Sequence, residues 1–145
     1  MKIESTAFGN NGRISTKYTC DGENISPPLA FSGVPQEAKT LALIVDDPDA
    51  PVGLWVHWLL WNISLETKTI GENSIPKGAD EGITSFGVAH YGGPCPHDGE
   101  HRYFFKLYAL DVELELPKGA TKEQLEEAMM GHVLDKSEII GYYSR

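Results

Sequence analysis

The chain has 145 residues, 41% of them hydrophobic and 23% charged, which is the composition of one globular domain large enough to bury an ordinary core. Its formal net charge of −9 argues against binding to nucleic acid and against electrostatic docking on anionic membranes. No apolar run approaches the length of a membrane span, about 18 residues, and residues 1–5 are too polar to begin a signal peptide, so we expect a single cytoplasmic domain over residues 1–145 without stable membrane insertion.

The first forty residues are rich in turns, with short strand candidates around Ile14 and at residues 29–31. Residues 40–46 (TLALIVD) then form an apolar, β-branched run that predicts a buried strand. Residues 54–63 (LWVHWLLWNI) are apolar on both faces, so their period alone leaves a helix open. Their Trp, Val and Ile content favours a second strand.

Residues 64–92 are predicted to form a long polar loop with a weak strand signal near Ile70. A third strand is predicted at residues 101–111 (HRYFFKLYALD), where a period of two places His101 and Tyr103 on one face and Arg102 on the other.

A capping box made by Thr121 and Gln124 predicts one helix, which ends at Gly131. Residues 137–143 predict a terminal strand. Several strands with one or two short helices indicate a mainly-β domain, built as two packed antiparallel sheets.

Two cysteines lie at positions 20 and 95, in no spacing typical of a metal site. In a reducing compartment the default is two free thiols. A bridge between cysteines that meet in the fold stays open.

The acidic corner at residues 47–51 (DPDAP) joins the first two predicted strands. Its prolines stiffen the backbone, and either X-Pro bond could be cis, with a base rate of roughly one in twenty. Asp47 lies nearer the strand end and is the better site candidate. Asp49 suits a turn in which its carboxylate caps backbone amides, with a ligand-binding role as the alternative.

His57 follows this corner and shares a strand face with Trp55, which would form an apolar wall of a pocket. A single histidine in a core strand is commonly structural. A carboxylate close by, such as Asp47, would favour the imidazolium and orient the ring, which raises the case for a site.

The loop at residues 92–100 contributes Gly93 and Pro94 and leads into His101 and Tyr103. Glycines allow backbone amides to approach a ligand, and such amides can line an anion-binding concavity. Arg102 points the other way and is predicted to pair with an acidic residue. The alternative is an ordinary turn that enters an aromatic core strand.

Other chemistry has weaker support. A metal could in principle be held by Asp47, Asp49, His57 and His101, but no metal-type spacing is present. There is no nucleophile elbow, phosphate loop or dinucleotide fingerprint. We therefore expect no enzyme activity, metal or cofactor, with an acid–base hydrolase as the remaining alternative.

Five stretches in order make a more specific pattern than any one of them. They are residues 18–29 (YTCDGENISPPL), 47–51 (DPDAP), 55–58 (WVHW), 91–96 (YGGPCP) and 101–103 (HRY). Together they resemble the phosphatidylethanolamine-binding protein (PEBP) family, and in particular its prokaryotic Raf-kinase-inhibitor-like branch.

The resemblance implies a Greek-key β-sandwich with a small anion-binding pocket near one end. Family pocket positions correspond to a set of residues here: Asp47, His57, Gly93, Pro94, His101 and Tyr103, with Asp49 and Trp55 beside them. It further implies binding of phosphate-type anions or phosphoryl head groups, no established reaction, and a homodimer. Inhibition of a kinase or a serine protease through the protein surface is the alternative function.

This chain departs from the family at several positions. His97 stands where a second proline is common, Phe31 where tryptophan is common, and Val56 where the eukaryotic branch has histidine. The long C-terminal helix of that branch is also missing. These differences weaken a transfer of kinase regulation or of phospholipid binding.

Two aspartates would repel a phosphate unless a cation compensates their charge. The hypothesis from the sequence is that Asp47 keeps His57 protonated, and that His57, His101, Tyr103 and loop amides bind the phosphoryl oxygens. Phosphate affinity would then fall as the pH rises through the histidine pKa values.

Overall fold

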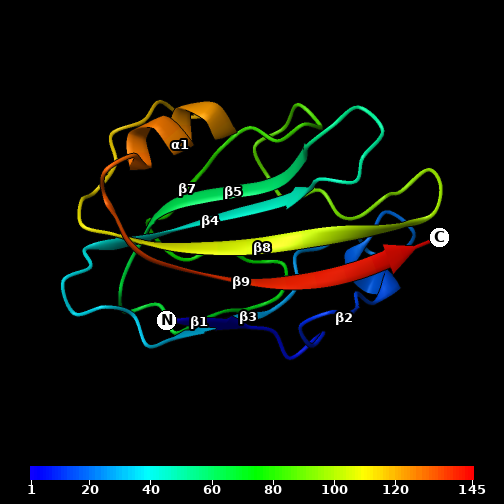
Figure 1. The fold of residues 1–145 in the computed structure, drawn as a ribbon, viewed down its shortest axis with the longest axis horizontal. Coiled ribbons are helices and arrows are strands. Elements are labelled where there is room, and N and C mark those ends of the chain that lie inside the picture. The colour runs from blue at the N-terminus through cyan, green and yellow to red at the C-terminus, as the bar shows by residue number, and fades with distance from the viewer.

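A computed structural model describes residues 1–145 and arranges them as two β-sheets and one α-helix (Figure 1). One sheet has the strand order β1-β3-β6 and the other has the order β2-β9-β8-β4-β5-β7. The strands are β1 (Lys2–Glu4), β2 (Gly12–Arg13), β3 (Leu29–Ser32), β4 (Thr40–Asp47), β5 (Trp55–Ile63), β6 (Thr69–Ile70), β7 (Asp80–Glu81), β8 (Glu100–Leu110) and β9 (Val133–Ser144). The helices are a 3-10 turn, η1 (Thr16–Tyr18), and the α-helix α1 (Lys122–Met129).

The larger sheet contains a Greek key. Strands β4, β5 and β7 are antiparallel neighbours, and β8 then returns to pair antiparallel with the opposite edge of β4. The pair β2–β9 is parallel and is the exception in an otherwise antiparallel sandwich. The expected fold class is confirmed.

Most predicted elements are present. The ambiguous run at residues 54–63 is strand β5, and the predicted strand at 101–111 is β8. The terminal strand β9 begins at Val133 rather than at position 137, because it pairs along nearly the whole of β8. The long loop carries two short strands: β6, which includes the weakly indicated Ile70, and β7, which was not predicted.

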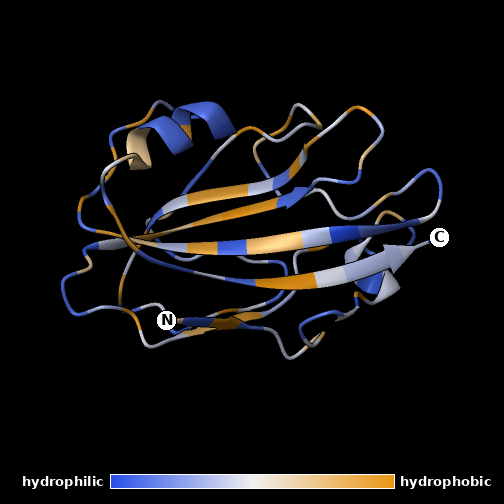
Figure 2. Cartoon of the chain, in the orientation of Figure 1, coloured by the Kyte–Doolittle hydropathy of each residue, from blue (hydrophilic) through white to orange (hydrophobic).

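The main core lies between the two sheets. Ile3 and Phe31 from the smaller sheet belong to one buried cluster with Val45, Trp58 and Phe105 from the larger sheet. Strands β4 and β5 are hydrophobic over most of their length, in contrast to the polar surface of α1 (Figure 2). Burial of such side chains, at about 25 cal/mol per Å² of apolar area, provides the main driving force for this packing.

Helix α1 covers the other face of the larger sheet. Thr121 accepts a hydrogen bond from the Gln124 amide, and the Gln124 side chain accepts one from the Thr121 amide, which confirms the capping box. Leu125 and Met129 are buried in a second apolar cluster that includes Trp61. No helix in the chain is long and apolar enough to cross a membrane.

Strand alternation separates the two aspartates at the end of β4. Asp46 points to the helix side of the sheet, where it forms an ion pair with Lys106 at 3.0 Å. Asp47 points to the side of the smaller sheet, where it meets His101. The two successive carboxylates therefore lie on opposite faces of the same sheet.

Cys20 and Cys95 form a disulfide bond, so the default expectation of two free thiols is wrong. The two segments already lie side by side, since the Cys20 amide donates to the Pro94 carbonyl and the Tyr91 hydroxyl donates to the Tyr18 carbonyl. No peptide bond is cis, so the bonds before Pro48 and Pro51 are both trans.

Candidate functional site

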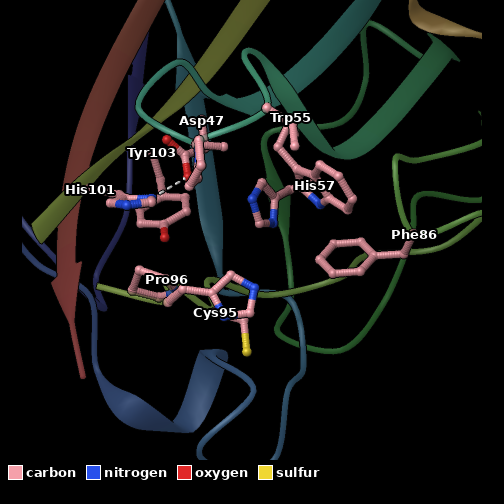
Figure 3. A pocket seen from close by; sticks show the side chains of 12 residues that line it. Asp47, Trp55, His57, Phe86, Cys95, Pro96, His101 and Tyr103 are labelled. Atoms are coloured by element: carbon pink, nitrogen blue, oxygen red, sulfur yellow. Dashed lines mark hydrogen bonds and ion pairs between the residues drawn. The ribbon is translucent and has the colours of Figure 1, made fainter. Parts of the chain in front are cut away.

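A pocket of about 410 Å³ lies at the end of the larger sheet, where β4 ends and where β5 and β8 begin (Figure 3). Such a volume is typical of a small-molecule site. The pocket is lined by Asp47, Ala50, Pro51, Val52, Trp55, His57, Phe86, Cys95, Pro96, His97, His101 and Tyr103.

Asp47 and His101 form the acidic wall of the pocket. The His101 Nδ1 lies 2.7 Å from the Asp47 Oδ2, and both side chains are buried. The other carboxylate oxygen, Oδ1, accepts a hydrogen bond from the Asp49 amide at 2.7 Å. Asp47 thus orients His101, and the hypothesis that it pairs with His57 is wrong.

His57 is held by a backbone carbonyl instead. Its Nδ1–H donates to the Gly92 carbonyl at 2.6 Å, and the side chain is buried. Burial lowers the pKa of His57 to about 4, and the Gly92 carbonyl and the Asp47 charge only partly offset that effect. His57 is therefore neutral at physiological pH, which contradicts the expected imidazolium. Its Nε2 is the ring nitrogen left for a ligand.

Tyr103 lies between the two histidines, with its ring edge-on to His57 at 5.2 Å and roughly parallel to that of His101 at 6.4 Å (Figure 3). Its side chain is only 1% exposed, and its hydroxyl has no hydrogen-bond partner within the protein. Burial raises the pKa of Tyr103, so the phenol keeps its proton and can donate it. Because Tyr103 also lines the pocket, its unpaired hydroxyl is a candidate donor to a ligand atom.

The opposite wall is apolar. The rings of Trp55 and Phe86 pack edge to face, with their centroids 5.5 Å apart. The Phe86 centroid also lies 5.4 Å from that of the His57 ring. The turn that carries Phe86 is attached to β5 by reciprocal bonds between Val56 and Ser85. Phe86 was missed because it lies alone in a polar loop, where no periodicity marks it.

Asp49 does not line the pocket. Both of its oxygens bind the Arg102 guanidinium at 2.9 Å, and one also accepts from the Arg102 amide. Arg102 lowers the pKa of Asp49. The prediction that Arg102 pairs with an acidic residue is confirmed. Asp49 stabilises the corner at residues 47–51 through this pair and lies outside the pocket.

Gly93 and Pro94 form the framework behind the pocket rather than its lining. The Gly93 amide donates to Asn24 at 2.8 Å, and the Gly92 amide donates to the His57 carbonyl at 3.0 Å. A side chain at position 93 would collide with the Tyr18 carbonyl, which explains the glycine. These two amides are already bonded within the protein, so they do not form the expected anion cradle.

Several lining residues were not among the predicted site residues: Ala50, Pro51, Val52, Phe86, Cys95, Pro96 and His97. Most of them flank predicted positions in the sequence, so proximity to the two proline-rich loops was the available signal. No group of three or more His, Cys, Asp or Glu side chains is placed to hold a metal ion.

Comparisons with known proteins agree with this architecture. The family model of phosphatidylethanolamine-binding protein matches residues 4–144. A UPF0098 protein from Methanothermobacter thermautotrophicus is 52% identical, and the match covers 100% of this chain and 99% of that protein. A UPF0098 protein from Chlamydia muridarum is 47% identical over the same shares of the two chains.

Solved structures give the same result. The crystal structure of a putative PEBP homologue from Chlamydia trachomatis superposes with a TM-score of 0.96 at 46% identity, covering 99% of this chain and 97% of that one. E. coli YbcL, a member of the mammalian PEBP family, superposes with a TM-score of 0.92 at 29% identity, covering 99% and 98%. The matched fold and the matched sequence together show that the chain belongs to the phosphatidylethanolamine-binding protein family.

Proposed function

We propose that this chain is a binding protein whose pocket takes a phosphate-type anion or a phosphoryl head group. The observation that carries the proposal is the Tyr103 hydroxyl, which is buried and unpaired between His57 and His101. A buried donor without a partner costs free energy, and a phosphoryl oxygen would satisfy it.

The arrangement favours binding over turnover. The Nδ1 atoms of His57 and His101 are engaged by fixed partners within the protein, and so is the Asp47 carboxylate. The only cysteine in the pocket, Cys95, is in the disulfide, and no serine, threonine or lysine lines the cavity. Preformed polar groups without a free nucleophile suit recognition of a ligand.

The pocket is larger than inorganic phosphate. A water molecule takes about 30 Å³ of liquid volume, and the pocket has about 410 Å³. Its apolar wall, with Trp55, Phe86 and Val52, therefore suits an organic substituent on the phosphoryl group. A phosphoryl head group with a carbon-bearing substituent fits both ends of the pocket.

The test is calorimetric titration of the protein with inorganic phosphate and with phosphoethanolamine, after purification without either anion. We expect saturable 1:1 binding that Tyr103→Phe weakens roughly tenfold or more, because a hydrogen bond to a charged oxygen is lost. Tyr108→Phe is the matched control, since Tyr108 lies on the same strand outside the pocket. Absence of binding to the unmodified protein would refute the proposal.

A second candidate function uses the surface around the pocket. Four apolar side chains are exposed on the two turns near its mouth: Val52, Leu54, Phe86 and Val88. Val52 is 78% exposed, and an exposed apolar group of this kind suits a contact with another protein. The partner would be a kinase or serine protease that the chain inhibits, or a second copy of the chain in a homodimer. Val52→Asp should abolish such a contact, whereas Tyr103→Phe should leave it intact. Light scattering of both variants tests the homodimer.

A further inference from the structure

The polar end of the pocket has a defined hydrogen-bond polarity. His57 and His101 each direct Nδ1 at a group that only accepts, the Gly92 carbonyl at 2.6 Å and the Asp47 carboxylate at 2.7 Å. In each neutral ring Nδ1 therefore carries the proton, and Nε2 carries a lone pair. The Tyr103 hydroxyl is the unpaired donor between them.

The pocket contains no fixed cation. None of its lining residues is lysine or arginine, and Asp47 contributes a negative charge. Arg102 follows His101 in the chain, but its guanidinium is bound to Asp49 outside the cavity. A fully deprotonated phosphate would add like charge to a partly desolvated site, which is unfavourable.

The two histidines differ in what lies behind them. The partner of His101 is the carboxylate of Asp47. The partner of His57 is a neutral carbonyl, and burial lowers the pKa of His57 to about 4. His57 is therefore the ring that keeps its lone pair and needs a donor from the ligand.

Building on the function proposed above, we infer that this site selects a phosphoryl group that carries its own acidic proton, namely a singly protonated phosphate monoester, over a phosphodiester. The P–OH group donates to the His57 Nε2, and the Tyr103 hydroxyl donates to a charged phosphoryl oxygen. A diester has charged oxygens but no proton to donate, so it covers the His57 lone pair without pairing it.

The cavity presents the same titratable side chains to both esters. The titratable groups around the cavity come from three places: Asp47 on β4, His101 and Tyr103 on β8, and His97 on the loop before β8. His97 is exposed at the rim, while the other three are buried. The contrast between monoester and diester therefore depends on His57.

The test compares methyl phosphate with dimethyl phosphate by calorimetry at about pH 5. At that pH both carry one negative charge, because the second pKa of a phosphate monoester is about 6. They differ by one methyl group and by the P–OH. We expect methyl phosphate to bind roughly ten- to hundredfold more tightly.

Two variants locate the effect. Tyr103→Phe should weaken both ligands by a similar factor and keep their ratio, since the lost donor serves an oxygen common to both. His57→Leu should bring the ratio close to one. His57→Gln, which keeps an acceptor, should retain part of the ratio and serves if the leucine variant does not fold.

Binding of the two esters to the unmodified protein tests this inference separately from the proposed function. Equal affinities of the two esters for the unmodified protein would overturn the inference and leave the proposed phosphoryl site standing. Tighter binding of dimethyl phosphate would overturn it in the same way. Failure of both esters, of inorganic phosphate and of phosphoethanolamine to bind would instead refute the proposed function.

Discussion

Asp47 accepts a hydrogen bond from His101, 54 residues away, and not from His57, which is only ten positions downstream. The pairing is possible because β8 lies directly beside β4, although the two strands are far apart in the sequence. It leaves His57 with the neutral Gly92 carbonyl as its hydrogen-bond partner, whereas His101 has a carboxylate. The chemistry of the pocket depends on this difference.

Stability should fall with acid through His57. Its pKa is about 4 in the folded protein and 6.5 for an unperturbed histidine, so the unfolded chain binds more protons between these values. The contribution is fully present above about pH 6.5 and is lost as the pH falls toward 4, by up to about 3 kcal/mol. Urea denaturation across this range measures it. His57→Gln should flatten the curve, whereas His97→Gln, at the exposed rim, should not.

Asp49→Asn should affect stability and leave ligand binding intact. The Asp49–Arg102 pair is partly exposed, so we expect a loss of about 0.5–1 kcal/mol in the free energy of unfolding. Because Arg102 lowers the pKa of Asp49, this contribution is present at neutral pH and is lost as the pH falls below about 4. Phosphate titration should give a dissociation constant within about twofold of the unmodified protein.

Asp47→Asn is the matched comparison for that experiment. It removes the charged acceptor that orients His101, and we expect the loss of that orientation to outweigh the relief of charge repulsion, so phosphate affinity should fall roughly tenfold or more. Equal effects of the two substitutions on affinity would contradict the assignment of Asp47 to the site and Asp49 to its support.

Phe86→Ala should reduce affinity only for phosphates with an organic substituent. Its ring forms the apolar wall with Trp55, and an aromatic contact of this kind contributes about 0.5–1.5 kcal/mol beyond its buried area. Phenyl phosphate should therefore lose roughly tenfold in affinity, while inorganic phosphate is unchanged. Val133→Ala, at an exposed position outside the pocket, is the control. A parallel loss for both ligands would show that Phe86 acts through the fold instead.

Removal of the disulfide should destabilise the chain. The bond joins residues 75 positions apart, and cross-links over long loops contribute typically about 2–4 kcal/mol. Denaturation with and without reductant measures the loss, and a double Cys20→Ser, Cys95→Ser variant should match the reduced protein. Alkylation of two thiols without reductant, detected by mass spectrometry, would contradict the bridge.

Local patterns were reliable wherever an element depends on its own residues. The strand at residues 40–46, the strand at 101–111 and the capped helix after Thr121 are all present, because apolar periodicity and capping are properties of short segments. The weak strands β6 and β7 are two residues each and exist only through pairing with β3 and β5. Such pairing leaves little trace in sequence.

The same division holds for the site. The fold class, the family pattern, the corner at residues 47–51, and the pocket residues His57, His101 and Tyr103 could be predicted from the sequence, since these depend on residue identity and order. Four results required the folded structure: Asp47 pairs with His101, Asp49 pairs with Arg102, Cys20 is bonded to Cys95, and His57 is neutral. These outcomes depend on which strands lie side by side and on how completely each group is removed from water, and both arise from contacts between residues far apart in the chain.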